Sequence, residues 1–245
     1  YPFGKFPLPS EAPWYEPLSL LTMIASNTTN IKLATAVLIA PLRNPALLAK
    51  TAATLDSISK GRLELGVGLG WQKEEYDTAG LSFENRAEVF WETLDICKLL
   101  WEDSPISFNG KYFNFDDIWC HPQPPQGKDL PLLFGLKMTP ENASKIARVG
   151  HGWIPIKTSR DFISEGKQIL SEAFINAGRN DQPRIRGQLP TCVDEDGLPN
   201  IQLTLNEIEK SMAAGLDEVE VFPINFVQGP EDIYKVLKLI SEVKK

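Results

Sequence analysis

Three alternating glycines, followed by an indole and an acidic turn, are the residues of this sequence best suited to bind a ligand. The glycines are Gly66, Gly68 and Gly70. Glycine permits positive φ and carries no Cβ, so a flat or charged group can approach the backbone closely. Trp71 follows directly, and Glu74 lies in the acidic first turn that a helix dipole favours. A tight strand-to-helix turn that binds nothing explains the same spacing about as well.

The glycine spacing differs from that of a dinucleotide-binding loop, which needs Gly-x-Gly-x-x-Gly and a ribose-binding carboxylate after a short βαβ unit. Other groups able to do chemistry are few. His121 lies in a proline-stiffened segment, which favours a packing or surface role over a catalytic one. The cysteines are scattered and odd in number, which favours neither a disulfide framework nor a Cys-x-x-Cys site. Because the histidines and cysteines form no cluster of metal ligands, the sequence predicts no metal site. These residues are His121, His151, Cys97, Cys120 and Cys192.

Composition narrows the function further. The 245 residues are 42% hydrophobic and 23% charged, which is typical of globular domains. A net charge of −7 argues against a nucleic-acid or anionic-membrane partner. No apolar run is long enough for a membrane span, and no signal peptide is visible. Together with the unpaired cysteines, these features predict a cytoplasmic protein.

A strand must position the glycines. Leu63, Leu65 and Val67 are apolar residues at every second position, which is the pattern of a strand, and this strand leads into the glycines. A proline-rich, aromatic-rich start, residues 1–15, predicts a loop that covers something. Asn44 is suited to cap a helix with Pro45 at its first position, and Lys60–Gly61 ends that helix. The other elements predicted in this half are a helix over 16–26, a strand buried on both faces over 31–40, and a helix over 84–101.

Residues 102–128 interrupt the alternation of strands and helices. Asn109–Gly110 between two short aromatic runs predicts a β-hairpin over 106–115. The alternation then resumes, with Thr139 and Ser159 as helix caps and a capping box at Thr204–Glu207. The predicted strands are 132–134, 151–156, 184–189 and 218–224, and the last helix begins near Gly229.

Six strand–helix units predict a parallel sheet covered by helices. A doubly wound sheet and a (β/α)₈ TIM barrel both fit this count. The helix that precedes the first predicted strand favours the barrel, with its first strand, first helix and second strand lying before Tyr1. We therefore predict one TIM-barrel domain over residues 1–245, with the inserted hairpin at about 102–128.

These residues resemble a known family. The carrying motifs are Asn44-Pro45, Asp56 with Gly61-Arg62, Gly66-Val67-Gly68, Gly70-Trp71, Pro122-Gln123-Pro124 and Gly150-His151-Gly152-Trp153. In their order and spacing, these motifs resemble those of the luciferase-like monooxygenase superfamily. They resemble more closely its branch of coenzyme F420-dependent oxidoreductases. The resemblance implies a (β/α)₈ barrel with F420 as cofactor, or FMN as the alternative.

The resemblance also implies where the cofactor binds. Its ring would lie at the carboxyl-terminal mouth of the barrel, against a non-prolyl cis peptide at Ala36-Val37 with Thr35 beside it. The loop after the central strand would run along the ring and its ribityl chain, through Gly68, Leu69, Gly70, Trp71 and Glu74. The phosphate would bind at Gly135, Leu136, Lys137 and Thr139, where a capped helix start favours an anion.

Three departures from the family pattern bear on function. The usual Gly-Gly-x-Ser/Thr reads Gly135-Leu136-Lys137-Met138-Thr139 here, which weakens the expected phosphate site. His151 replaces the usual aspartate, as either a packing change or a titratable group near the mouth. Trp71 stands where some deazaflavin-dependent dehydrogenases have glutamate, so their sugar-phosphate chemistry is not implied.

The resulting hypothesis is an oxidoreductase that transfers a hydride between F420 and a small organic substrate. An FMN-dependent monooxygenase is the first alternative, and a non-catalytic flavin-binding barrel is the second. The catalytic residues stay unknown, because the family's catalytic histidine ends the second strand, before Tyr1. The expected partner is a small-molecule substrate, with neither nucleic acid nor membrane, and the chain is compatible with a homodimer.

Overall fold

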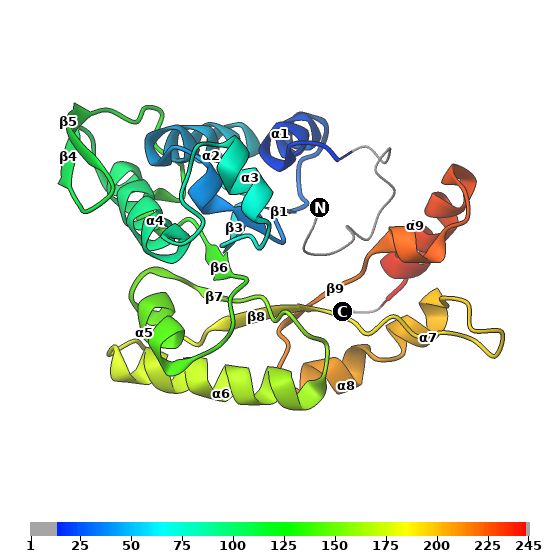
Figure 1. The fold of residues 1–245 in the computed structure, drawn as a ribbon. Coiled ribbons are helices and arrows are strands. Elements are labelled where there is room, and N and C mark those ends of the chain that lie inside the picture. The colour runs from blue at the N-terminus through cyan, green and yellow to red at the C-terminus, as the bar shows by residue number, and fades with distance from the viewer. Residues whose placement is uncertain (1–13, 244–245) are drawn as a thin grey trace. The chain divides into compact units, whose positions relative to one another are not determined.

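The computed structural model describes residues 14–243, which belong to two compact units. The first unit ends at Gly135 and the second begins at Leu136. Each unit contains parallel strands and helices, and each is described by itself (Figure 1). Most of the predicted covering loop, residues 1–13, lies outside the described residues. The single-domain organisation stays a prediction.

The first unit is built around β3 (Leu63–Gly68), all of whose residues are buried. It pairs in parallel with β1 (Leu33–Ala34), β2 (Leu38–Ile39) and β6 (Leu132–Phe134). In this register Val67 lies beside Phe134, whose ring stacks on Trp91 of α4 (Arg86–Glu102) at 5.4 Å. Because side chains alternate along a strand, Leu63, Leu65 and Val67 share this helix-facing side. Glu64, Gly66 and Gly68 therefore lie on the opposite face.

The predicted strand over 31–40 is divided in two. Ala34 pairs with Glu64, and Leu38 pairs with Val67. One stretch therefore has an extra residue relative to its neighbour, as in a bulge, and the ladder is interrupted over residues 35–37. The Ala36–Val37 peptide in this interruption is cis, which confirms that prediction.

The first unit also contains helices, and the one that follows Asn44 has the caps that the sequence predicts. The helices are α1 (Pro17–Asn27), α2 (Pro45–Ser59), α3 (Lys73–Thr78) and α4 (Arg86–Glu102), with short 3₁₀ turns at Ala40–Leu42 and Gly127–Asp129. The Asn44 Oδ1 accepts hydrogen bonds from the backbone N–H groups of Ala46 and Leu47, as predicted. Helix α2 ends at Lys60, which adopts φ 59° in the left-handed region.

A buried carboxylate ties α2 to the end of the inserted segment. Asp56 accepts hydrogen bonds from the backbone N–H of Leu63 and from the backbone and side chain of Gln126. The Gln126 side chain also donates to the Leu63 carbonyl at 2.8 Å. These bonds hold the start of β3 in place, which in turn positions the glycines at its other end.

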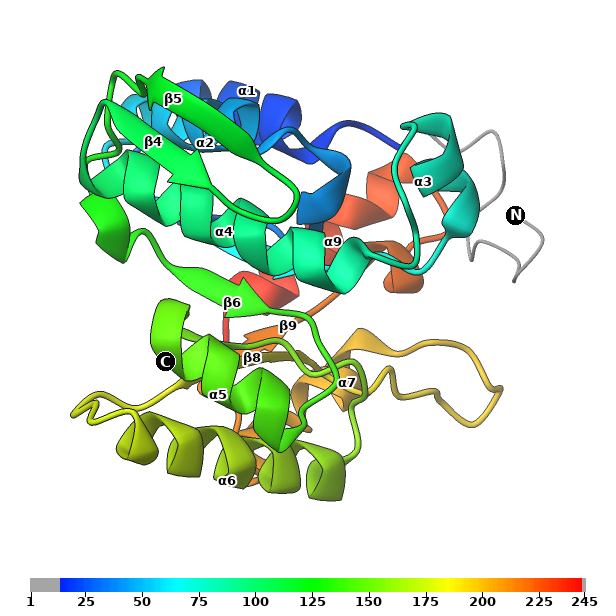
Figure 2. The same ribbon diagram turned by 60° about the vertical axis from the view of Figure 1, so that its left-hand side comes forward.

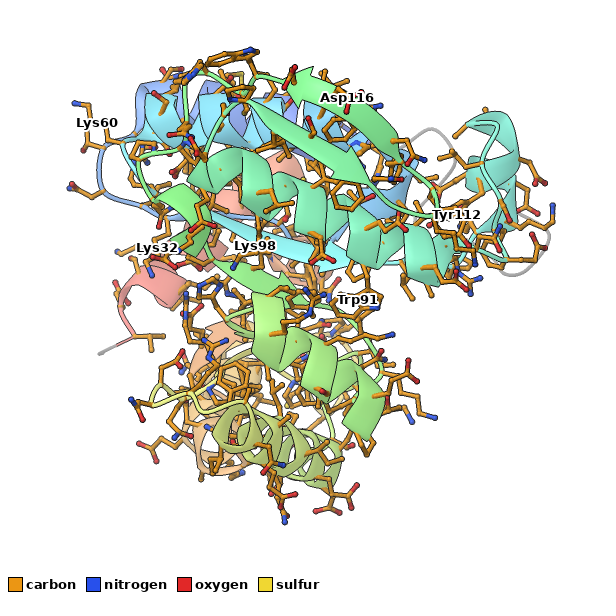
Figure 3. The ribbon with its side chains drawn as sticks, turned by 90° about the vertical axis from the view of Figure 1, so that its left-hand side faces the viewer. Lys32, Lys60, Trp91, Lys98, Tyr112 and Asp116 are labelled. Atoms are coloured by element: carbon orange, nitrogen blue, oxygen red, sulfur yellow. The ribbon has the colours of Figure 1, made fainter. Side chains whose placement is uncertain are left out.

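The predicted hairpin forms a separate antiparallel pair, β4 (Ile106–Asn109) and β5 (Asn114–Ile118). It lies beside α4 in both views (Figure 2). Glu92 of α4 accepts hydrogen bonds from three consecutive backbone N–H groups, those of Lys111, Tyr112 and Phe113. Figure 3 labels Tyr112 at this turn and Asp116 on β5. The hairpin is therefore held on α4 through its turn.

The second unit contains the parallel strands β7 (Gly152–Trp153), β8 (Arg184–Gln188) and β9 (Glu218–Glu220). Helices α5 (Pro140–Val149) and α6 (Arg160–Asn176) lie side by side in it. Trp153 is fully buried, and a Cβ on Gly166 of α6 would lie 2.3 Å from its ring. The glycine therefore lets the helix approach the indole.

The prediction for residues 204–207 is wrong. Thr204 does not begin a helix but lies inside α7 (Ile201–Leu205), which Asn200 caps by accepting from the Leu203 N–H. The Thr204 hydroxyl instead accepts from the Cys192 N–H at 3.0 Å, a contact that the local sequence does not reveal. The remaining elements are α8 (Ile208–Ala213), 3₁₀ turns at Pro223–Phe226 and Pro230–Asp232, and α9 (Ile233–Ser241).

The described residues thus have an α/β fold with parallel strands. Among them, no helix is long and apolar enough to cross a membrane. No group of three or more His, Cys, Asp or Glu residues within 14–243 is placed to hold a metal ion.

Candidate functional site

The predicted site residues fall into two groups. Those of the first unit follow β1, β3 or β6, at the carboxyl ends of these strands or in the segments after them, the edge where parallel α/β folds bind ligands. They are Thr35, Ala36, Val37, Gly68, Leu69, Gly70, Trp71, Glu74 and Gly135. Leu136, Lys137 and Thr139 belong to the second unit.

Val37 lies over the ends of two strands. A Cβ on Gly68 would lie 2.8 Å from its Cγ2, and a Cβ on Gly135 would lie 2.8 Å from its Cγ1. Both glycines are therefore needed to accommodate this one branched side chain. Because Val37 is 37% exposed, its outer side forms a small apolar platform at the strand ends.

The glycines themselves have a role in packing. Gly70 adopts φ 72°, and a Cβ there would lie 2.8 Å from Ile39 Cγ2. The space beside Gly68 and Gly70 is thus filled by Val37 and Ile39, whereas the sequence suggested that it was left bare for a ligand. A contact of either glycine's backbone with a cofactor stays a prediction.

Thr35 is buried, and its hydroxyl donates to the Gly66 carbonyl at 2.7 Å. This bond links the interrupted stretch to β3 where the regular ladder is absent. Thr35 therefore supports the platform from within the strand layer, and its predicted contact with a cofactor stays untested.

The loop after β3 presents an exposed indole and a carboxylate. Trp71 is 53% exposed. Glu74, in the first turn of α3, has its Oε2 buried without a hydrogen-bond partner among the described residues. The Tyr76 hydroxyl donates to the Leu69 carbonyl and closes the loop, and burial raises the pKa of Tyr76 to about 12. Tyr76 is therefore a neutral structural group at physiological pH.

The predicted phosphate position fits an anion less well than its cap suggests. Pro140 at the first helical position has no N–H, and Thr139 Oγ1 already accepts from the Asn142 N–H. Glu141 adds a carboxylate to this turn, paired with Lys145 at 2.8 Å. Lys137 is exposed and available to an anion. The helix start therefore offers few free donors.

His151 lies at the amino end of β7, which begins at Gly152. Its carbonyl accepts from the Arg184 N–H at 3.0 Å. Ligands of parallel sheets bind at the opposite, carboxyl ends. This position favours the packing interpretation of His151.

A model of the luciferase-like monooxygenase family matches residues 3–197 of the chain. The chain belongs to this family. A mycobacterial relative, an uncharacterized protein of Mycobacterium tuberculosis, is 35% identical over 171 residues, which are 69% of this chain and 60% of the relative. A pyrimidine monooxygenase, RutA of Methylobacterium radiotolerans, is 40% identical over 116 residues, 44% of this chain and 30% of the relative. The chain thus spans at most about 60% of these curated relatives.

Solved structures of both cofactor types share this luciferase-like fold. The coenzyme F420-dependent tetrahydromethanopterin reductase of Methanopyrus kandleri aligns with a TM-score of 0.76 at 20% identity, over 93% of this chain and 86% of its own. The oxygenating constituent of 3,6-diketocamphane monooxygenase of Pseudomonas putida, in complex with FMN, has a TM-score of 0.74 at 19% identity, over 93% and 82%. Both likenesses show the fold alone.

Sequence reasoning missed a charged cluster on β8 and β9 of this luciferase-like chain. The Arg186 Nε donates to Glu218 Oε2 at 2.6 Å, and the Arg184 Nε donates to Glu218 Oε1 at 3.1 Å. Burial alone would raise the pKa of Glu218, but the hydrogen bonds from both arginines hold it below its usual value. The alternation of charged and other residues over 184–188 and 218–220 was the available signal.

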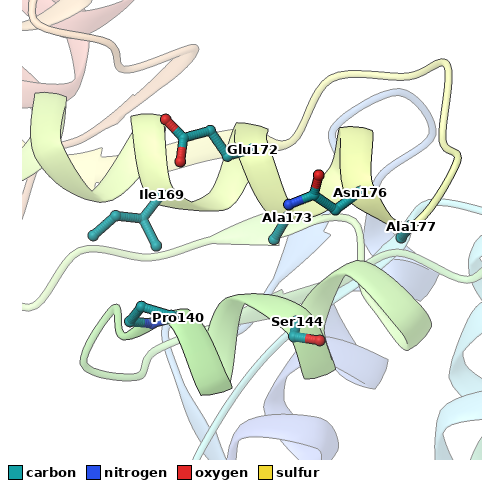
Figure 4. Close-up of a pocket in the computed structure, with 7 residues that line it drawn as sticks. All are labelled: Pro140, Ser144, Ile169, Glu172, Ala173, Asn176 and Ala177. Carbon is teal, nitrogen blue, oxygen red and sulfur yellow. The ribbon is translucent and has the colours of Figure 1, made fainter.

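Two cavities among the described residues lie away from the strand ends. A groove of about 280 Å³ between α5 and α6 is lined by Pro140, Ser144, Ile169, Glu172, Ala173, Asn176 and Ala177 (Figure 4). A second, of about 250 Å³, lies beside Arg62 near the amino end of β3. The Arg62 side chain is fully used, donating to Ser59, Thr28, Ile31 and Ala25. None of the predicted cofactor residues lines either cavity.

Proposed function

We propose that this luciferase-like chain is an oxidoreductase that transfers a hydride between coenzyme F420 and a small organic substrate. The observation that carries the proposal is the platform of Val37 at the carboxyl ends of β3 and β6. Parallel α/β folds bind their ligands at this edge. The exposed apolar side chains of Val37 and, in the loop after β3, Trp71 suit a flat, largely apolar ring.

The residues of the first unit fit the cofactor. Val37 would contact the ring, and the loop from Leu69 to Trp71 would run along it. The unpartnered Glu74 Oε2 is a hydrogen-bond acceptor of the kind that a ribityl hydroxyl needs. When bound, F420 supplies the hydride, and the protein supplies binding, orientation and exclusion of water.

An FMN-dependent monooxygenase is the second candidate, supported by the relative named pyrimidine monooxygenase and by the FMN-bound structural neighbour. FMN ends at its phosphate and depends on a strong phosphate site. The helix start at Thr139 offers few donors and carries Glu141. F420 extends beyond its phosphate, so this weak site favours F420. A non-catalytic flavin-binding barrel would bind a cofactor without turnover.

The proposal extends to the whole protein. We expect a complete (β/α)₈ barrel with the hairpin inserted, active in the cytoplasm on a small molecule, and compatible with a homodimer. The catalytic proton donor is not among the predicted site residues.

Titration of the purified protein with F420 and, separately, with FMN tests the proposal, because binding quenches the fluorescence of each. We expect F420 to bind and FMN to bind more weakly. Val37→Asp would place a charge on the platform and should weaken binding at least tenfold, since burying an unpaired charge is costly. Val193→Asp, at a residue 53% exposed in the second unit, is the matched control. Failure of both cofactors to bind, or equal binding by Val37→Asp, would overturn the proposal.

A further inference from the structure

One face of the β8–β9 pair carries polar side chains. Arg186 lies opposite Glu218 and Gln188 lies opposite Glu220 in parallel register. The other face is apolar, because a Cβ on Gly187 would lie 2.8 Å from Leu216 Cδ2. Since side chains alternate along a strand, all the polar residues of the pair share the first face.

Three of the charged side chains on this face are joined to one another. Arg184 and Arg186 both form ion pairs with Glu218. Arg186 is buried, and Glu218 is about one-third exposed along its side chain. The two arginines therefore hold Glu218, and Glu220 is the other carboxyl group on this face.

Glu220 and Gln188 are the polar residues at the carboxyl ends of their strands. Neither side chain has a hydrogen-bond partner within residues 14–243. Burial raises the pKa of Glu220, although nearby Arg186 opposes the shift. A half-buried carboxyl and an amide without protein partners are thus placed together at the edge where parallel sheets bind ligands.

We propose that Glu220 and Gln188 form a binding site for a ligand that carries an amide group. Neighbouring strands lie about 4.8 Å apart, so the two side chains reach two different atoms of a ligand. An amide presents a donor and an acceptor on adjacent atoms: its N–H donates to the Glu220 carboxyl, and its C=O accepts from the Gln188 side chain. The site lies in the second unit and does not depend on a cofactor, so it goes beyond the proposed function.

A pair of small lactams tests this site on the native protein. 2-Pyrrolidinone has both an N–H and a C=O, whereas N-methyl-2-pyrrolidinone has lost the N–H. We expect 2-pyrrolidinone to bind at least tenfold more tightly in NMR titrations and to shift the amide signals of residues 188 and 220 and the Gln188 side-chain signal. Equal affinity of the two lactams, or shifts confined to other residues, would overturn the proposal.

Two variants test the residues individually. Glu220→Leu and Gln188→Leu should each weaken 2-pyrrolidinone binding at least tenfold, while Glu209→Gln, an exposed glutamate of α8, should not change it. The lactam comparison needs no substitution, so it tests the proposed site even if a variant folds poorly. Cofactor titration of the same sample is a separate measurement, so the two proposals can fail independently.

Discussion

At the scale of single residues, Val37 explains why glycines occupy the strand ends. Its two γ-methyl groups fill the space that a Cβ would need at Gly68 and Gly135. Protein interiors are close-packed, so even one added methyl group disturbs the packing of its neighbours. The glycines therefore support the fold whether or not a cofactor binds.

Gly68→Ala should accordingly destabilise the protein by about 1–3 kcal/mol, the usual effect of overpacking. Urea denaturation measures this change. Val37→Ala should relieve the clash, so the double variant should be more stable than the sum of the two single effects indicates. Strict additivity would contradict the packing of Val37 against Gly68.

At the scale of elements, α4 serves both the sheet and the inserted hairpin. Its Trp91 and Phe90 pack on Phe134 of β6. The Glu92 side chain accepts hydrogen bonds from three backbone N–H groups of the hairpin turn. The Glu88 side chain accepts hydrogen bonds from the side chains of Lys111 and Tyr112. The hairpin thus depends on α4 for its position.

Glu92→Ala should open the hairpin turn locally, because three backbone N–H groups lose their acceptor. We expect hydrogen exchange at residues 111–113 to accelerate at least tenfold, with little change at β3. Glu88→Ala is the control: it removes exposed contacts of a kind worth about 0–1 kcal/mol and should barely affect these amides. Similar exchange in the two variants would mean that Glu92 does not hold the turn.

At the scale of the whole molecule, stability in acid depends on carboxylates with shifted pKa values. The pKa of Glu218 is lower in the folded protein than its usual value of 4.5. A carboxyl group whose pKa is lower in the folded than in the unfolded state contributes stability above its unfolded-state pKa. That contribution is lost as pH falls through the folded-state pKa. Glu220 has a raised pKa, so its contribution is present at low pH and is lost as pH rises.

Urea denaturation at a series of pH values checks these signs. The free energy of unfolding should fall as pH drops below about 4.5, and Glu218→Gln should flatten that decline. The unmodified protein should lose some stability as pH rises above about 4.5, because ionising Glu220 is unfavourable in the folded state. Glu220→Gln should remove that loss. The opposite signs would show that the arginines do not stabilise ionised Glu218 or that Glu220 is not desolvated.

The sequence by itself determined the family, the α/β class, and the features set by neighbouring residues. Asn44 and Thr139 cap their helices, because each cap depends on bonds only a few residues away. The hairpin forms as predicted, but its turn covers residues 110–113 instead of Asn109–Gly110, because Asn109 pairs with Asn114 at the end of β4. The family pattern also located the cis peptide at Ala36–Val37.

Only the tertiary structure decided what lies beside these residues. The space at Gly68 is filled by Val37, and the Thr204 hydroxyl accepts from Cys192 instead of starting a helix. The Glu218 cluster joins two strands more than thirty residues apart in the chain. Periodicity reports which face a side chain takes but not which distant residue meets it there, because strand register is set by the packing of the complete sheet.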